Sequence, residues 1–288
     1  MFYVIDAKTS KQFYGGDQGW FVSNTRAYAG CGPVAAANMW ITLLKKHPQL
    51  IKPSSQTLLQ PAPKQSYSAN VPSCDKNTYM DLMNNLYEAI KTLEVPVLNW
   101  IYDHCSRENK FFKKVAPTNG RSICGFIKGF LRYAKNQGVL LHAHTLPTAF
   151  CSYEKGLHFI EAGLKECGAV VLLTSFNRHP LTLYRDTCGK LEQPYELKEG
   201  MRCHFATITD IFYPADSSPV LILSTWGRIA SVKLDSLAAT WQSRKALDSA
   251  LFYFTPADFP EVTDKGIKSA RRMLFQAVRQ TLFKKSYT

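Results

Sequence analysis

A cysteine placed between two glycines, directly before a long apolar helix pattern, constrains this chain more than any other stretch. Residues 28 to 40 read Tyr-Ala-Gly-Cys-Gly-Pro-Val-Ala-Ala-Ala-Asn-Met-Trp. Proline is well tolerated in the first helical turn, where its missing N–H has no partner to lose, and the glycines permit close backbone approach. The sequence therefore predicts a helix over residues 33–46, with Cys31 at its N-terminus or one residue before it.

The start of a helix is a favourable place for a reactive thiol. There Cys31 would meet unpaired N–H groups and the positive end of the helix dipole, and both favour the thiolate over the thiol. The alternative is a buried cysteine that fills space, which is what most cysteines in intracellular proteins do. A base close to Cys31 in the fold would decide between the two interpretations.

Length and composition indicate a globular protein. With 288 residues, the chain can bury one large core or two small ones. No apolar run approaches the roughly 20 residues that a membrane-spanning helix needs. The first residues lack the basic and apolar regions of a secretory signal. We therefore expect a cytoplasmic protein without a transmembrane segment.

The eight cysteines form no C-x-x-C pair and no Cys/His spacing suited to zinc. We expect no metal and no cofactor. In a chain without a secretory signal, reduced thiols are the simplest interpretation, although the even number leaves structural disulfides open.

The net charge of +13 raises nucleic acid and anionic membranes as partners. The basic residues are spread along the chain, however, and no nucleic-acid-binding motif accompanies them. We expect a solvated basic surface, no specific nucleic acid, and a peptide or protein substrate, with the charge favouring an acidic one. The oligomeric state is left open.

Periodicity predicts early helices and later strands. Residues 1–30 are expected to form a short strand and an irregular loop, and the proline-rich residues 47–74 a loop insertion. The expected further helices are 79–93, 122–136, 153–166 and a basic C-terminal helix, 265–285. The expected strands are 139–144, 169–174, 181–184, 203–212, 220–224, 229–233 and 250–254. This order indicates the α+β class, with an antiparallel sheet.

Among seven histidines, His204 is the best candidate for the base. It begins an alternating strand, and residues 220–228 form a second strand after a loop. Two antiparallel strands joined in this way can place residues near 204 and 224 side by side. Ser224 would then orient the imidazole, which gives a nucleophile, a base and an orienting group. Asp210, on the same strand face as His204, is the alternative orienting group, although it lies roughly 20 Å along an extended strand.

These motifs resemble those of the papain-like cysteine peptidase superfamily, in its C39-like (bacteriocin-processing-type) branch. Residues 30–39 are similar to the nucleophile motif of that branch, and Asp17-Gln18-Gly-Trp20 to the Gln/Trp stretch that often precedes it. His204 matches the family's histidine. Leu223-Ser-Thr-Trp-Gly227 is similar to the Asn-Ser-Trp-Gly of papain-like enzymes. The matched motifs cover about 40 residues.

The resemblance implies a papain-like fold, in which N-terminal helices pack on a C-terminal antiparallel sheet. Residues 1–255 would form the C39-type domain, with residues 47–74 as a loop insertion. Residues 256–288 would be a basic helical extension.

The resemblance also implies roles for residues. Cys31 would attack, His204 would carry the proton and Ser224 would orient His204. Gly30, Gly32 and Trp226 would line the site. The oxyanion hole would use the Cys31 N–H and a side chain upstream, for which Asn24 and Gln18 are candidates.

The chain departs from the family at two places. Ser224 stands where the family has Asn or Asp, and Thr25 stands where papain-like enzymes have the oxyanion glutamine, six residues before the cysteine. The expected function is a thiol hydrolase that cleaves a peptide or amide bond. The alternatives are a weak or inactive papain-like binding module, and a deamidase or acyltransferase on the same fold.

Overall fold

The computed structural model describes residues 2–22, 26–27, 29–51, 73–90, 123–149, 151–174, 181–187, 190–194, 201, 204–215, 217–241 and 249–257. Its helices are η1 (Gln18–Trp20), α2 (Cys31–Lys46), η2 (Pro48–Leu50), α3 (Lys76–Ala89), α6 (Ile123–Asn136), α7 (Tyr153–Cys167) and α8 (Leu234–Trp241). Its strands are β1 (Tyr3–Asp6), β2 (Lys11–Tyr14), β3 (Ser73–Asp75), β4 (Leu141–Pro147), β5 (Val170–Leu173), β6 (Tyr184–Thr187), β7 (Lys190–Pro194), β8 (Phe205–Phe212), β9 (Val220–Thr225), β10 (Arg228–Lys233) and β11 (Ala250–Pro256).

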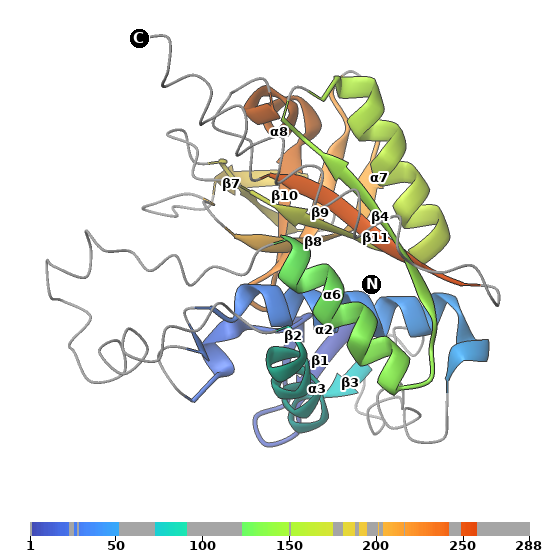
Figure 1. The fold of residues 1–288 in the computed structure, drawn as a ribbon. Helices are drawn as coiled ribbons and strands as arrows, with labels where there is room; N and C mark the ends of the chain where they lie inside the picture. Colours follow the sequence, from blue (N-terminus) through green and yellow to red (C-terminus); the bar gives the residue numbers. More distant parts are fainter. Residues whose placement is uncertain are drawn as a thin grey trace, which may run out of the picture.

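The described strands form two sheets. The larger has eight strands in the order β4-β11-β5-β8-β9-β10-β6-β7, and every neighbouring pair in it is antiparallel. The smaller has the order β2-β1-β3, with β1 antiparallel to β2 and parallel to β3. The expected α+β class and the antiparallel main sheet are therefore confirmed (Figure 1).

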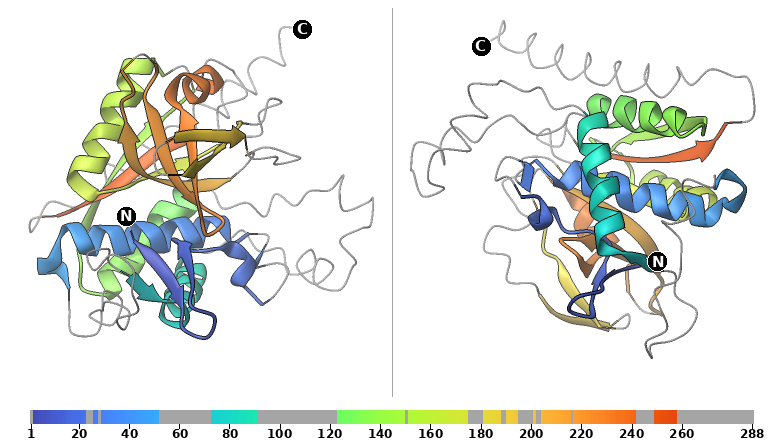
Figure 2. Two further views of the ribbon diagram at one scale, coloured as in Figure 1. Left: turned by 180° about the vertical axis from the view of Figure 1, so that it is seen from behind. Right: turned by 90° about the horizontal axis from the view of Figure 1, so that it is seen from below.

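Helices cover both faces of the large sheet. Strand alternation places Phe252 and Phe254 of β11 against α6, with ring centroids 4.9 Å and 4.3 Å from Phe126 and Phe130. Tyr253, between them, points to the other face and meets α7. Figures 1 and 2 accordingly show α2 and α6 on one side of the sheet and α7 on the other.

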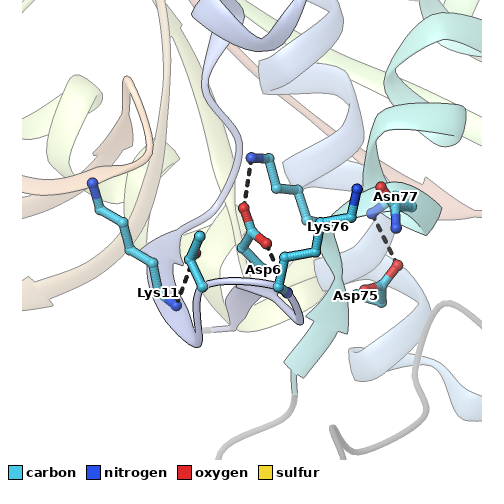
Figure 3. Close-up of polar contacts among 7 residues, drawn as sticks. Asp6, Lys11, Asp75, Lys76 and Asn77 are labelled. Carbon is cyan, nitrogen blue, oxygen red and sulfur yellow. Dashed lines mark hydrogen bonds and ion pairs between the residues drawn. The ribbon is translucent and has the colours of Figure 1, made fainter.

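The small sheet is joined to the start of α3 by polar contacts (Figure 3). Lys76 Nζ lies 2.9 Å from a carboxylate oxygen of Asp6, and this hydrogen bond is the main reason that the pKa of Asp6 is lowered. The Asp75 carboxylate accepts from the N–H groups of Asn77 and Thr78, which caps α3. The N-terminal segment is thereby fixed beside the helices.

The structure corrects several element boundaries. The first long helix begins at Cys31, two residues earlier than expected, and β2 occupies part of the expected loop. Neither β7 nor α8 was expected. Residues 52–72 of the expected insertion and 258–288 of the expected extension lie outside the described residues.

None of the described helices combines the length and apolar character that crossing a membrane requires.

Candidate functional site

Cys31 is the first residue of α2, as the Gly-Cys-Gly-Pro stretch predicted. Gly30 precedes it as the N-cap, and a Cβ there would lie 2.7 Å from the Phe21 ring and 2.8 Å from the Arg26 carbonyl oxygen. Only glycine fits this close approach. Gly32 is buried, whereas Cys31 is half-buried and is a thiol rather than part of a disulfide. The Cys31 thiol is therefore partly exposed at the N-terminal end of a buried helix.

His204 lies immediately before β8 and is buried. Its Nε2 is 2.7 Å from Thr225 Oγ1, and its ring stacks on that of Trp226 with centroids 4.3 Å apart. Its backbone is held as well, because its N–H donates to Thr174 Oγ1 and its carbonyl accepts from the Thr174 N–H. The imidazole therefore has a fixed place and a fixed plane.

Burial lowers the pKa of His204 to about 3. The imidazole is therefore neutral at neutral pH, with one ring nitrogen protonated and the other an acceptor. When Nε2–H donates to Thr225, Nδ1 is the nitrogen that can accept a proton. A neutral ring nitrogen can accept a proton, and so low a pKa makes it a weak base at neutral pH.

The helix α2 and the strand β8 run in the same direction. In the middle of both, Asn38 Nδ2 lies 3.5 Å from Thr207 Oγ1. Towards the C-terminus of α2, a Cβ on Gly168 would lie 3.0 Å from Thr42 Cγ2, and β5, which follows Gly168, begins opposite Ile208. Residues later in α2 therefore lie beside residues later in β8.

This shared direction brings the two N-terminal ends to one edge of the sheet. Cys31 precedes Asn38 by seven residues, about 10 Å at 1.5 Å per helical residue. His204 precedes Thr207 by three residues, also about 10 Å at 3.3 Å per strand residue. The two side chains are placed at the same end, and the contact between the Cys31 Sγ and the His204 ring stays a prediction.

The orienting group is not Ser224. Its hydroxyl donates to the Tyr14 carbonyl oxygen, 2.9 Å away, and accepts from Asn38 Nδ2 at 3.0 Å. The register explains this result: Ser224 pairs with Thr207, so the two share a face, and His204, three residues earlier, points to the other. Thr225 is the next residue, shares the face of His204 and carries the hydroxyl that contacts it.

Asp210 is not the orienting group either. It is exposed on β8, and its carboxylate accepts from the N–H of Ile211.

The two oxyanion candidates have different outcomes. Gln18 lies in η1, where its Oε1 is a buried oxygen without a hydrogen-bond partner in the described part of the chain. Asn24 lies outside the described residues. The Cys31 N–H is in the first turn of α2, at the positive end of the helix dipole.

Trp226 occupies a strained turn. It has φ 49° and Gly227 has φ 67°, so the two residues between β9 and β10 form a tight hairpin turn with both φ angles positive. Such a φ is uncommon for a bulky residue and requires support from its surroundings. Two backbone hydrogen bonds supply it, from Tyr14 N–H to the Gly227 carbonyl and from Gly227 N–H to the Gly16 carbonyl.

Sequence reasoning missed Thr225 and Asn38. An asparagine in the middle of an otherwise apolar helix was a readable signal for a buried polar contact. No feature of the sequence marked Thr225, because its contact with His204 depends on the pairing register of β8 and β9.

No protein-family model matches the chain, and no curated protein is significantly similar to it in sequence. Within the described residues, no group of three or more His, Cys, Asp or Glu side chains is arranged to hold a metal ion.

Proposed function

We propose that this chain is a papain-like thiol hydrolase that cleaves a peptide or amide bond. The observation that carries the proposal is the hydrogen bond between His204 and Thr225 at the end of the sheet where α2 begins with Cys31. Cys31 begins α2 and His204 directly precedes β8 at the same end of the two elements, which supports a nucleophile and a base from neighbouring parts of the chain. The C39-like motifs add support, and the whole of residues 1–255 would form the enzyme.

The chemistry uses Nδ1 of His204 as the base. The Cys31 thiol gives its proton to Nδ1 while sulfur attacks the carbonyl carbon of the substrate, which forms a tetrahedral intermediate. The C–N bond then breaks, and the amine leaves with the proton from the imidazolium. Water, deprotonated by Nδ1, hydrolyses the thioester and restores the thiol. Acyl transfer to an amine would differ only in this last step.

The negative charge of the tetrahedral intermediate needs donors. The Cys31 N–H lies at the positive end of α2, which favours an anion. Gln18 would give the second hydrogen bond through its amide, if the side chain turns its NH₂ group towards the substrate. The stacked Trp226 would keep water from the His204 ring.

Alkylation with iodoacetamide tests the proposed pair without knowledge of the substrate. We expect Cys31 to react faster at pH 7 than Cys124, a half-buried thiol in α6 that serves as the internal control. We expect His204→Ala to lower the Cys31 rate to that of Cys124 while the fold, followed by circular dichroism, is retained. Equal rates for both cysteines in the unmodified protein would contradict the pair.

A peptide library derived from a bacterial proteome tests the hydrolysis itself. Mass spectrometry of the products should find new termini that Cys31→Ala abolishes and that His204→Ala reduces at least about 100-fold, the usual contribution of a general base. Cleavage that persists in Cys31→Ala would disprove the proposed nucleophile. Reactive Cys31 without cleavage would favour the binding-module or acyltransferase alternatives.

A further inference from the structure

Asn38 uses all of its hydrogen-bonding capacity inside the core. Its side chain is 1% exposed. The Oδ1 atom accepts from the Gly16 N–H at 3.2 Å and from the Tyr79 hydroxyl at 2.8 Å. The Nδ2 atom donates to Ser224 at 3.0 Å and to Thr207 at 3.5 Å. An asparagine amide offers two donors and two acceptor sites, so every one of them is occupied.

The network continues from Asn38 into the N-terminal segment. Ser224 donates to the Tyr14 carbonyl oxygen. Gly15 has φ +69°, and a Cβ there would lie 2.3 Å from Ser224 Oγ and 2.7 Å from Asn38 Oδ1. Segment 14–16 is thus pressed against the two polar side chains at a distance that only glycine allows.

The same segment also holds the β9–β10 turn. The Tyr14 N–H and the Gly16 carbonyl are both hydrogen-bonded to Gly227. Segment 14–16 therefore connects Asn38 and Ser224 on one side with the turn of Trp226 and Gly227 on the other.

Thr225 and Trp226, which contact the His204 ring, each stand next in the sequence to a residue of this network. Ser224 is fixed by Asn38, and strand alternation then directs Thr225 to the opposite face, where His204 lies. Gly227 is fixed by segment 14–16, and the preceding Trp226 stacks on the ring.

We infer that Asn38 is a positioning residue. By holding Ser224 and segment 14–16, its amide sets the hydroxyl of Thr225 and the ring of Trp226 against the His204 imidazole. Its assignment to catalysis rests on the proposed function. A purely structural role for Asn38 would change stability alone, so the test needs a measurement on the imidazole itself.

Nitrogen-15 NMR of the His204 ring supplies that measurement, because protonated and bare ring nitrogens resonate far apart. In the unmodified protein we expect one tautomer, with the proton on Nε2. Ser224→Ala and Asn38→Ala should each produce a mixture of tautomers and lower the Cys31 alkylation rate at pH 7 about 3- to 30-fold, the size of one or two lost hydrogen bonds.

Thr42→Val is the matched control. The Thr42 hydroxyl is buried in the same helix, but it donates to the backbone carbonyl of Asn38 rather than to the side-chain network. This variant should lose stability and keep both the tautomer and the alkylation rate.

Two results would overturn the inference. One is a folded Ser224→Ala protein with the tautomer and alkylation rate of the unmodified chain. The other is loss of the fold in Ser224→Ala, which would make the network a requirement for folding only. Failure of the proposed function gives a different result. In that case His204→Ala would leave the Cys31 alkylation rate unchanged, while Ser224→Ala would still change the tautomers of His204.

Discussion

The imidazole of His204 is held from two directions by residues that are neighbours in the sequence. Thr225 meets Nε2 at 2.7 Å, and Trp226 covers one face of the ring. Thr225 carries no charge, so it can hold the His204 ring in place but cannot stabilise an imidazolium as a carboxylate would. The described contacts of the ring therefore supply orientation without a countercharge.

Replacing Thr225 tests this arrangement. Thr225→Val keeps the shape of the side chain and removes the oxygen at Nε2, so we expect peptide or amide hydrolysis to fall about 10- to 100-fold, the effect of losing a fixed tautomer without losing a charge. Thr225→Ser should retain most of the activity. Equal activity in Thr225→Val and the unmodified protein would show that another group orients the ring.

The buried His204 should also make stability depend on pH. Its pKa is about 3 in the folded chain and about 6.5 in an unfolded one. Between these values the unfolded state binds the proton and the folded state does not, so stability rises with pH through this window and is fully present above 6.5. Below pH 3 this contribution of His204 to the folding stability is absent.

Urea unfolding measures this contribution. The unmodified chain should lose about 2 kcal/mol more than His204→Gln when the pH is lowered from 7 to 5. The other titrating groups, including His144, whose pKa burial also lowers, are common to both chains and cancel in the comparison. Parallel pH dependence in the two proteins would mean that His204 is protonated in the folded state at pH 5.

At the scale of elements, the β9–β10 turn combines a strained backbone with a ring contact to His204. Hairpin turns of this kind favour Asn-Gly, yet this chain places Trp226 before Gly227 with φ 49°. Trp226→Asn should keep the unfolding free energy within about 1 kcal/mol, because relief of the positive φ offsets the lost ring contact. The Cys31 alkylation rate should nevertheless fall.

Trp226→Phe is the control, since it keeps an aromatic ring over His204 and keeps the strained φ. We expect it to react almost as the unmodified chain does. If Trp226→Asn reacted equally fast, Trp226 would be a turn residue without influence on His204.

The same elements show what the sequence could predict. The 3.6-residue period and the Gly-Cys-Gly-Pro start predicted α2, and alternation predicted β8 and β9. The register between those strands was not predictable, because the 213–219 connection does not fix which residues pair. A shift of one position exchanges the faces of Ser224 and Thr225.

The variant Ser224→Asn tests the observed register of β8 and β9. Asparagine at this position would restore the residue type that the papain-like motif has there. In the fold, Ser224 lies where a Cβ on Gly15 would be only 2.3 Å away, and a larger side chain would overpack the site. We expect Ser224→Asn to destabilise the protein by about 1–3 kcal/mol.

The elements missed by the sequence lack a periodic signal. Strand β7 reads Lys-Leu-Glu-Gln-Pro, without alternation, and α8 has eight residues, which is little more than two turns. Their positions follow from tertiary packing: β6 pairs with β7, and Trp241 of α8 is pressed against Gly156 of α7.

At the scale of the whole molecule, the two sheets share one core. A single cluster of buried apolar residues runs from Phe2, before β1, to Phe254 of β11. The Asn38 network lies within this core and joins the N-terminal segment, α2, α3 and the large sheet. The candidate site thus depends on residues from both ends of the described chain, and its geometry requires that the small sheet stay docked.

Two buried cysteines can report whether the small sheet unfolds together with the large sheet. Cys74 lies in β3 of the small sheet and Cys167 at the end of α7, and both side chains are at most 1% exposed. Burial raises the pKa of Cys74 to about 12 and that of Cys167 to about 11. Neither thiol should react in the folded protein, because the reactive thiolate is both inaccessible and rare.

Pulses of iodoacetamide at increasing urea concentration, with each cysteine mapped by mass spectrometry and normalised to the fully unfolded chain, would follow both sites. If the shared core makes folding cooperative, Cys74 and Cys167 become reactive at the same urea midpoint. Earlier labelling of Cys74 would mean that the small sheet opens on its own. In that case segment 14–16 would leave the β9–β10 turn while the large sheet stayed folded, and Cys31 should lose its enhanced reactivity at the midpoint of Cys74 rather than at that of Cys167.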